Sequence, residues 1–313
     1  MTRRSLLSVL QEQDWNRYLE ERMKKENGLY DCAMVLEGGA TRGIFTAGAL
    51  DFLMEKEVYL DYVVGVSAGC CNAVDYVSRQ IGRTKQCLVP PPGVEPYMSI
   101  KSTLVNRTLF DMDLLFDKYA KEMIPFDFEA FFDSQIICEI TASNCFSARP
   151  AYFRVKNRDR ERLLNICKAS SSMPIVSRTV EIDGLPYLDG GITDSVPVLH
   201  VESLGYSKQV VILTQKRGYR KKPTSEREKL LIMKGLEEYP AIRDTLLARP
   251  QAYNATMDLI DNMEAEGKIF VLRPVGHITR RTEHNPDKLL EFYYHGYRRM
   301  EQEFDRLMQY LDQ

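Results

Sequence analysis

The early part of the chain repeats one pattern twice, and this repeat constrains the fold more than any other feature. Short apolar runs at residues 32–36 and 62–66 are each followed by a glycine-containing turn. After these turns, residues 43–55 and 68–79 have the apolar spacing of helices. Strands that alternate with helices in this way predict a parallel sheet covered by helices. We therefore expect an α/β protein.

The rest of the chain supplies further elements of both kinds. The predicted strands cover residues 136–142, 151–155, 179–182, 186–188, 209–214 and 268–272. The predicted helices cover residues 159–169, 225–238, 242–266 and 286–311. Asp183-Gly184 has the composition of a tight turn and predicts a hairpin between two of these strands.

Composition excludes several classes of function. The net charge is −2 over 313 residues, so no basic face predicts a nucleic-acid partner. Seven cysteines without a C-x-x-C pair indicate reduced thiols in a cytosolic protein. No apolar run approaches the ~20 residues of a spanning helix, and a polar segment follows Arg3-Arg4. We expect a cytoplasmic protein, with peripheral contact to a membrane as a further expectation.

Gly65-Val66-Ser67-Ala68-Gly69 is a G-x-S-x-G motif between a predicted strand and a predicted helix. This context is typical of a nucleophile elbow, in which the serine occupies a sharp turn. Gly65 and Gly69 remove side chains that would collide with neighbouring backbone. Amides at the start of the next helix favour an anion near Ser67.

A second small-residue loop, Gly38-Gly39-Ala40-Thr41-Arg42-Gly43, also joins a strand to a helix. Its amides are candidates for an oxyanion hole, formed by Gly38, Gly39 and Ala40. Arg42 and Gly43 are supporting positions, and Arg42 is a candidate for holding the loop or an anionic head group. The pattern of a P-loop is absent.

Asp189-Gly190-Gly191 follows the predicted hairpin. A serine nucleophile needs a base, which is usually histidine. The chain has four histidines, and none lies in a small-residue loop; His200 is expected at the end of a helix. Asp189 is therefore a candidate base, with Gly190 and Gly191 supporting it.

The glycine loop, the serine elbow and the D-G-G motif, in this order, resemble the patatin-like phospholipase family, of the bacterial type. Ala169-Ser170-Ser171-Ser172-Met173-Pro174 and Val196-Pro197 also match its pattern. The resemblance covers about residues 32–215. A departure is Ala40, where the family often has a third glycine; a positive φ there would strain the backbone.

The resemblance implies a three-layer α/β/α patatin-like sandwich with a mostly parallel central sheet and a helical C-terminal extension. It also implies a hydrolase of fatty-acyl esters of lipids or phospholipids, acting in lipid degradation. Ser67 would be the nucleophile and Asp189 the base of a Ser-Asp dyad, with no cofactor and no metal. An acyl-enzyme would form and water would release the fatty acid. Asp189 must then be shielded from water and lie near Ser67.

The expected organisation has three parts. Residues 1–30 form an amphipathic helix that packs on the main domain or, alternatively, on a membrane surface. Residues 31–215 form the patatin-like catalytic domain, in which 82–132 are a cap or insertion that covers a core edge or admits acyl chains. Residues 216–313 form a mainly helical extension that completes the sheet near residues 268–272.

Two other functions remain open from the sequence. An α/β-hydrolase-type carboxylesterase would use Ser67 with an aspartate and a histidine, for which His277 is the candidate. A non-catalytic membrane- or protein-binding module would keep the fold without turnover. The basic stretch 216–222 is expected to be a solvated loop, although its charge also suits anionic lipid surfaces.

Overall fold

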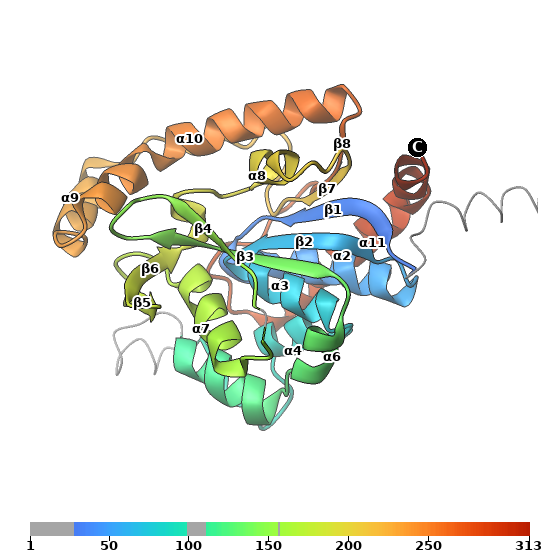
Figure 1. Ribbon diagram of the computed structural model, residues 1–313, viewed down its shortest axis with the longest axis horizontal. Coiled ribbons are helices and arrows are strands. Elements are labelled where there is room, and N and C mark those ends of the chain that lie inside the picture. Colours follow the sequence, from blue (N-terminus) through green and yellow to red (C-terminus); the bar gives the residue numbers. More distant parts are fainter. Residues whose placement is uncertain (1–27, 99–110, 156) are drawn as a thin grey trace, which may run out of the picture.

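The computed structural model describes residues 28–98, 111–155 and 157–313. At its centre lies an eight-stranded sheet of order β5-β6-β3-β2-β1-β7-β8, with β4 paired on β3 (Figure 1). The pairs from β3 through β2, β1 and β7 to β8 are parallel, whereas β4, β5 and β6 pair antiparallel. The strands are β1 (Tyr30–Leu36), β2 (Leu60–Val66), β3 (Ile137–Asn144), β4 (Pro150–Phe153), β5 (Val180–Ile182), β6 (Leu185–Asp189), β7 (Gln209–Ile212) and β8 (Ile269–Leu272).

Side chains of the central strands alternate between two apolar cores, one on each face of the sheet. In β1, Met34 and Leu36 enter one core, while Ala33 and Val35 enter the other. Because successive residues of a strand point to opposite faces, a run that is apolar throughout requires cover on both sides. This explains why the strands read as continuous apolar runs in the sequence.

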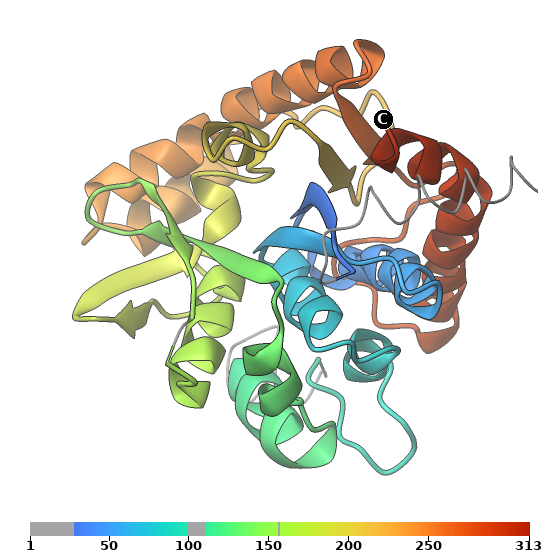
Figure 2. The same cartoon turned by 45° about the vertical axis from the view of Figure 1, so that its right-hand side comes forward.

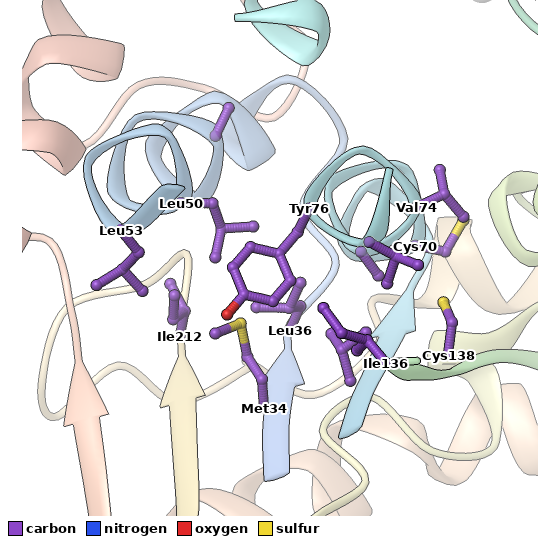
Figure 3. Packing of buried hydrophobic residues seen from close by; sticks show 14 of the residues in the cluster. Met34, Leu36, Leu50, Leu53, Cys70, Val74, Tyr76, Ile136, Cys138 and Ile212 are labelled. Atoms are coloured by element: carbon purple, nitrogen blue, oxygen red, sulfur yellow. The ribbon is translucent and has the colours of Figure 1, made fainter. Parts of the chain in front are cut away.

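Helices supply that cover in two layers (Figures 1 and 2). Side chains of α2, α3, α7 and α11 pack into the core of one face, and those of α8 and α10 into the core of the other. Figure 3 shows Leu50, Leu53 and Tyr76 of α2 and α3 above the strand residues Met34 and Leu36. The α helices are α2 (Gly43–Glu55), α3 (Ala68–Val77), α4 (Arg83–Leu88), α6 (Phe128–Asp133), α7 (Arg160–Ser171), α8 (Val198–Ser203), α9 (Glu226–Gly235), α10 (Pro240–Ala265) and α11 (Pro286–Leu311). Shorter or wider helical turns are η1 (Ala40–Arg42), η2 (Leu114–Met123) and η3 (Gly190–Ile192).

The expected α/β fold with a mostly parallel central sheet and C-terminal helices is confirmed. The hairpin turn is also as expected, since Asp183 and Gly184 both have positive φ, 52° and 76°. His200, expected at the end of a helix, lies in the last turn of α8. The predicted helix within residues 1–30 lies outside the described residues, apart from its last three positions.

The last helix, α11, crosses α2 at unusually close range. A Cβ added at Gly48 of α2 would lie 2.0 Å from the Tyr293 oxygen, and one at Gly296 of α11 would lie 1.9 Å from the Phe45 oxygen. A hydrogen bond of 2.6 Å from the Tyr293 hydroxyl to the buried Asp51 reinforces the crossing. The C-terminal helix is thus fixed against the helix that follows the glycine loop.

Strand β3 changes its neighbour along one edge, and this change positions the site. Thr141 of β3 pairs with Val66 at the end of β2, and the next residue, Ala142, pairs with Asp189 at the end of β6. Because β4 occupies the opposite edge at residues 140–143, β2 and β6 must share one edge of β3. The ends of these two strands therefore meet at consecutive positions of β3.

Among the helices of the described residues, none combines the length and the apolar composition needed to cross a membrane.

Candidate active site

Ser67 lies on a strained turn between β2 and α3. Its φ and ψ are 55° and −125°, which a residue with a side chain rarely adopts. Two flanking glycines make the turn sterically possible. A Cβ at Gly65 would lie 2.4 Å from the Gly69 oxygen, and a Cβ at Gly69 would lie 2.3 Å from the Leu36 oxygen. The result is a sharp strand-to-helix turn, which is the geometry that a nucleophile elbow requires.

Two buried serines at the end of α7, Ser170 within the helix and Ser172 at its C-cap, hold this turn and the aspartate together. Ser170 Oγ accepts a hydrogen bond from the Ser67 amide at 2.9 Å and donates to the Thr141 carbonyl at 2.6 Å. Two residues later, the Ser172 carbonyl accepts a bond from the Asp189 amide at 2.8 Å. The sequence indicated this segment only as part of a family resemblance and did not predict its hydrogen bonds. The signal was a run of serines at a helix end, which must satisfy buried polar groups.

Asp189 ends β6 and is 7% exposed. One carboxylate oxygen, Oδ1, accepts a hydrogen bond from the Gly191 amide at 2.8 Å. The other oxygen accepts none from any residue that the structure describes. Since Asp189 and Val66 pair with consecutive residues of β3, the aspartate lies beside the turn that carries Ser67.

The glycine loop leaves the carboxyl end of β1 and passes over the serine. A Cβ at Gly38 would lie 2.9 Å from Ser67 Cβ. The amides of Gly38, Gly39 and Ala40 donate no hydrogen bond to another described residue. Ala40 has a φ of 49°, so the strained conformation foreseen for this position does occur. Gly43 begins α2, where a Cβ would lie 2.8 Å from Ala68 Cβ.

A buried carboxylate that the sequence analysis missed fixes the base of this loop. Glu37 is 4% exposed, and its oxygens accept bonds from the Thr214 amide at 2.7 Å and the Tyr253 hydroxyl at 2.7 Å. Thr214 Oγ1 also lies 2.9 Å from the Gly38 carbonyl. Residues after β7 and within α10 therefore hold the loop in place.

Two cavities that differ in size and in polarity meet at Ser67. The narrower one, of about 100 Å³, runs among apolar side chains. Many of these belong to the region expected to be a cap, including Leu88, Leu115, Phe116 and Phe126. The wider one, of about 860 Å³, contains Ser67, Asp189 and the glycine loop.

Basic side chains line the wider cavity. They include Arg42 from the glycine loop, Lys221 from the loop after β7, Arg249 from α10 and Arg281 before α11. The expectation that the stretch 216–222 is a fully solvated loop was wrong for Lys221, which is half-buried with its ammonium 4.1 Å from the Tyr253 ring centre. Burial, followed by repulsion from Arg249, lowers the pKa of Lys221 to about 7.

None of the four histidines lines either cavity. His200 Nε2 lies 2.6 Å from Glu139, and its ring stacks on Tyr152. His295 accepts a bond from the Val275 amide, and His277 is exposed. Within the described part of the chain, no three His, Cys, Asp or Glu side chains come together as a metal site would require.

Comparison with known proteins identifies the family. A family model described as patatin-like phospholipase matches residues 34–201, which is more than half of the chain. The chain therefore belongs to the patatin-like phospholipases, a family of lipid acyl hydrolases, as the resemblance indicated. A second model, a domain of unknown function designated DUF6363, matches residues 239–312.

Two individual proteins resemble this chain at low to moderate sequence identity. The uncharacterized protein YjjU of Escherichia coli (strain K12) is 32% identical over 186 residues, which are 58% of this chain and 51% of that protein. The chain thus spans about half the length of this curated relative. The crystal structure of VipD from Legionella pneumophila is 12% identical with a TM-score of 0.45, and the likeness covers 92% of this chain and 69% of VipD.

Proposed function

We propose that this protein is a serine acyl hydrolase that cleaves fatty-acyl esters of phospholipids through Ser67 and Asp189. The pairing of Val66 and Asp189 with consecutive residues of β3 carries the proposal, because it brings a serine on an elbow next to a shielded carboxylate. Membership of the patatin-like phospholipases supports the reaction class. The absence of histidine from both cavities favours Asp189 over the histidine of a triad.

The proposed mechanism has two halves. Asp189 accepts the Ser67 hydroxyl proton as Oγ bonds to the ester carbonyl carbon, and the carbonyl oxygen becomes an oxyanion. Amides of Gly38, Gly39 and Ala40, which have no acceptor among the described residues, are the proposed donors to it. The carbon–oxygen bond to the alcohol then breaks, and Asp189 returns the proton to that alcohol. Water attacks the acyl-enzyme with Asp189 as base, releasing the fatty acid and restoring Ser67.

The two cavities fit the two parts of such a substrate. The narrow apolar cavity suits an acyl chain, and its walls from residues 82–132 support a role for this region as a cap. The wide cavity, which both basic and apolar side chains line, suits the alcohol part. In this organisation, residues 31–215 form the catalytic domain, and 216–313 form an extension that closes the wide cavity.

A lipid surface also fits the rim of the wide cavity. Leu230, Leu231 and Met233 of α9 are 72%, 50% and 44% exposed, and Ile175 and Val176 beside them are 45% and 38% exposed. Three of these residues line the cavity mouth. An apolar rim around a lipid-binding cavity is suited to peripheral contact with a membrane. We place this contact in the cytoplasm, since all seven cysteines are free thiols.

The test compares wild type, Ser67→Ala and Asp189→Asn on p-nitrophenyl butyrate and on a mixed-chain phospholipid, with EDTA present. Both variants should keep the circular dichroism of the wild type and lose activity by about 10³-fold or more. Asp194→Asn is the matched control, because this neighbouring carboxylate bonds Tyr152 and lines neither cavity. It should retain activity.

Other outcomes separate the alternatives. If Asp189→Asn stays active and His277→Gln does not, a triad is at work. If Ser67 is not labelled by a fluorophosphonate in the folded protein and no ester is cleaved, the protein is a binding module.

A further inference from the structure

The wide cavity holds an excess of positive charge that the carboxylates in its lining balance only in part. Arg42, Lys221, Arg249 and Arg281 line it. Among the described residues, none of these four forms an ion pair. By contrast, Arg220, next to Lys221 in the loop after β7, pairs with Asp258 and Asp261.

These four cations line a single cavity and lie close enough to repel one another. Burial is the main cause that lowers the pKa of Arg42, Lys221 and Arg249, and repulsion from Arg281 contributes to all three. Arg42 Nε is buried with no hydrogen-bond partner in the described structure. A partly buried cation without an ion-pair partner is costly, so a fold that gathers Arg42, Lys221 and Arg249 in one cavity favours an anionic ligand.

The carboxylates of the cavity balance this charge only in part. Glu37 attracts Arg42 and Lys221, and Asp189 attracts Arg249, but neither carboxylate forms an ion pair with them. Glu228 lies at the mouth, where it caps the start of α9 through Ser225. Arg220 and Lys222 add further basic groups to the lining. The cations therefore outnumber the carboxylates around the space beside Ser67.

The position of this charge relative to Ser67 defines what it binds. An ester bound at Ser67 with its acyl chain in the apolar cavity directs its alcohol part into the wide cavity. Guanidinium groups bind phosphate oxygens in pairs, and a lysine adds a point charge. The chemistry that matches is a phosphate group carried by the alcohol part of the ester.

We propose that Lys221, Arg249 and Arg281, with Arg42, form a subsite for the phosphate of an anionic glycerophospholipid whose acyl ester reaches Ser67. The proposal rests on the proposed function and narrows its substrate class to lipids of net negative head group. Lys221, Arg249 and Arg281 all lie outside the segment matched by the patatin-like model. Arg249 and Arg281 lie in the segment that matches the domain of unknown function, which thereby acquires a role.

The binding test uses the full chain with Ser67→Ala, so that no ligand is hydrolysed. Calorimetry measures three soluble probes: dihexanoyl phosphatidate, dihexanoyl phosphatidylcholine and inorganic phosphate. Phosphatidate should bind at least about ten-fold more tightly than phosphatidylcholine. Adding Lys221→Gln or Arg281→Gln should weaken phosphatidate binding by about ten-fold each. Arg281 is exposed, so its replacement leaves the core intact.

Arg280→Gln is the matched control, because this exposed neighbour of Arg281 does not line the cavity. It should leave binding unchanged. Equal affinity for phosphatidylcholine, or full affinity in the Lys221 and Arg281 variants, would overturn the subsite. Inorganic phosphate binding as tightly as phosphatidate would also overturn it, in favour of a site for the free ion.

Turnover distinguishes failure of the subsite from failure of the hydrolase. In the enzyme with Ser67 intact, the ratio of kcat/KM for phosphatidate to that for p-nitrophenyl butyrate should fall by about ten-fold in Lys221→Gln and Arg281→Gln. If hydrolysis depends on Ser67 but this ratio of kcat/KM values does not fall in the two variants, the proposed function is supported and the phosphate subsite is contradicted. If the protein binds phosphatidate selectively but hydrolyses no ester, the proposed function is contradicted and the anion-binding site is supported.

Discussion

At the scale of residues, the strain at Ser67 is held by a few buried hydrogen bonds. Ser170 is fully buried and joins the Ser67 amide to the Thr141 carbonyl. Thr141 is also the residue that pairs with Val66 immediately before the elbow. A single hydroxyl thus connects the turn to the strand that aligns it with Asp189.

Ser170→Ala should lower activity more than stability. The Ser67 amide would lose its buried acceptor, at a cost of about 1–3 kcal/mol, and the elbow would relax from its strained φ. We expect kcat to fall by about ten- to one hundred-fold with KM little changed. Steady-state kinetics on p-nitrophenyl butyrate, with thermal unfolding alongside, measures both effects.

Ser170→Thr provides the matched comparison, since it keeps the hydroxyl and adds one methyl group. Activity closer to wild type in Ser170→Thr than in Ser170→Ala would support the hydrogen bond as the cause. Wild-type kcat in Ser170→Ala would show that the elbow does not depend on this bond.

At the scale of elements, α9 combines two properties: hydrogen bonds cap its N-terminus, and most of its large apolar side chains are exposed. Ser225 and Glu228 form a capping box at its start. Only Ile232 of the helix is buried, whereas Leu230 and Met233 face solvent. A well-capped helix with an uncovered apolar face beside a cavity is suited to an interface with lipid.

Leu230→Glu combined with Met233→Glu should weaken binding to phospholipid vesicles. Placing two carboxylates on a face that enters the lipid interface removes apolar contact and adds repulsion from anionic lipid. We expect at least a ten-fold loss in sedimentation with phosphatidylglycerol vesicles.

Leu199→Glu is the control for this prediction. Leu199 is 58% exposed on α8, and it is not part of the cavity rim. It should leave vesicle binding at the wild-type level. If Leu199→Glu weakens sedimentation as much as the α9 variant does, the effect is one of charge alone and α9 has no special role.

At the scale of the whole molecule, the partly buried cations around the wide cavity, Arg42, Lys221 and Arg249, cost stability when no anion is bound. Lys221 illustrates this, with a pKa of about 7 in the folded protein and an ordinary value of 10.5 as reference. The groups that act on it are Arg249, Arg281 and Arg42, which repel it, and Glu37, which attracts it. Between these two pKa values the unfolded chain binds more protons than the folded chain. The contribution of Lys221 to stability therefore becomes more favourable as pH rises from about 7 to 10.5.

Lys221→Met should accordingly stabilise the protein at and below pH 7, by roughly 1–3 kcal/mol. The difference from wild type should shrink as the pH rises from 7 towards 10, because wild-type Lys221 is then neutral in the folded state. Urea unfolding in buffers without phosphate measures this difference. A Lys221→Met variant that is less stable than wild type at pH 6 would contradict the prediction.

The sequence predicted what depends on local patterns. Apolar runs predicted the central strands, and the Asp183-Gly184 pair predicted the hairpin turn, because both depend on a few adjacent residues. The position of Ala40 was foreseen as strained for the same reason. The placement of Lys221 could not be read from its basic neighbours, since it depends on Tyr253 of α10 and on the cavity behind it. The partners of Glu37 and Ser170 are likewise set by contacts across the sheet.

The pairing of β1 with β7 has a consequence for how the family boundary is understood. The segment matched by the patatin-like model ends at residue 201. However, the edge of β1 opposite β2 pairs with β7, and β7 pairs with β8, both of which lie beyond that residue. A fragment cut at that boundary would expose the main-chain groups of Ala33 and Glu37, which now bond to Lys208 and Ile212. Such an apolar, unpaired edge is a template for aggregation. The segment that the family model matches is therefore shorter than the segment that forms the complete sheet. Truncations and domain swaps should keep all strands of the sheet together.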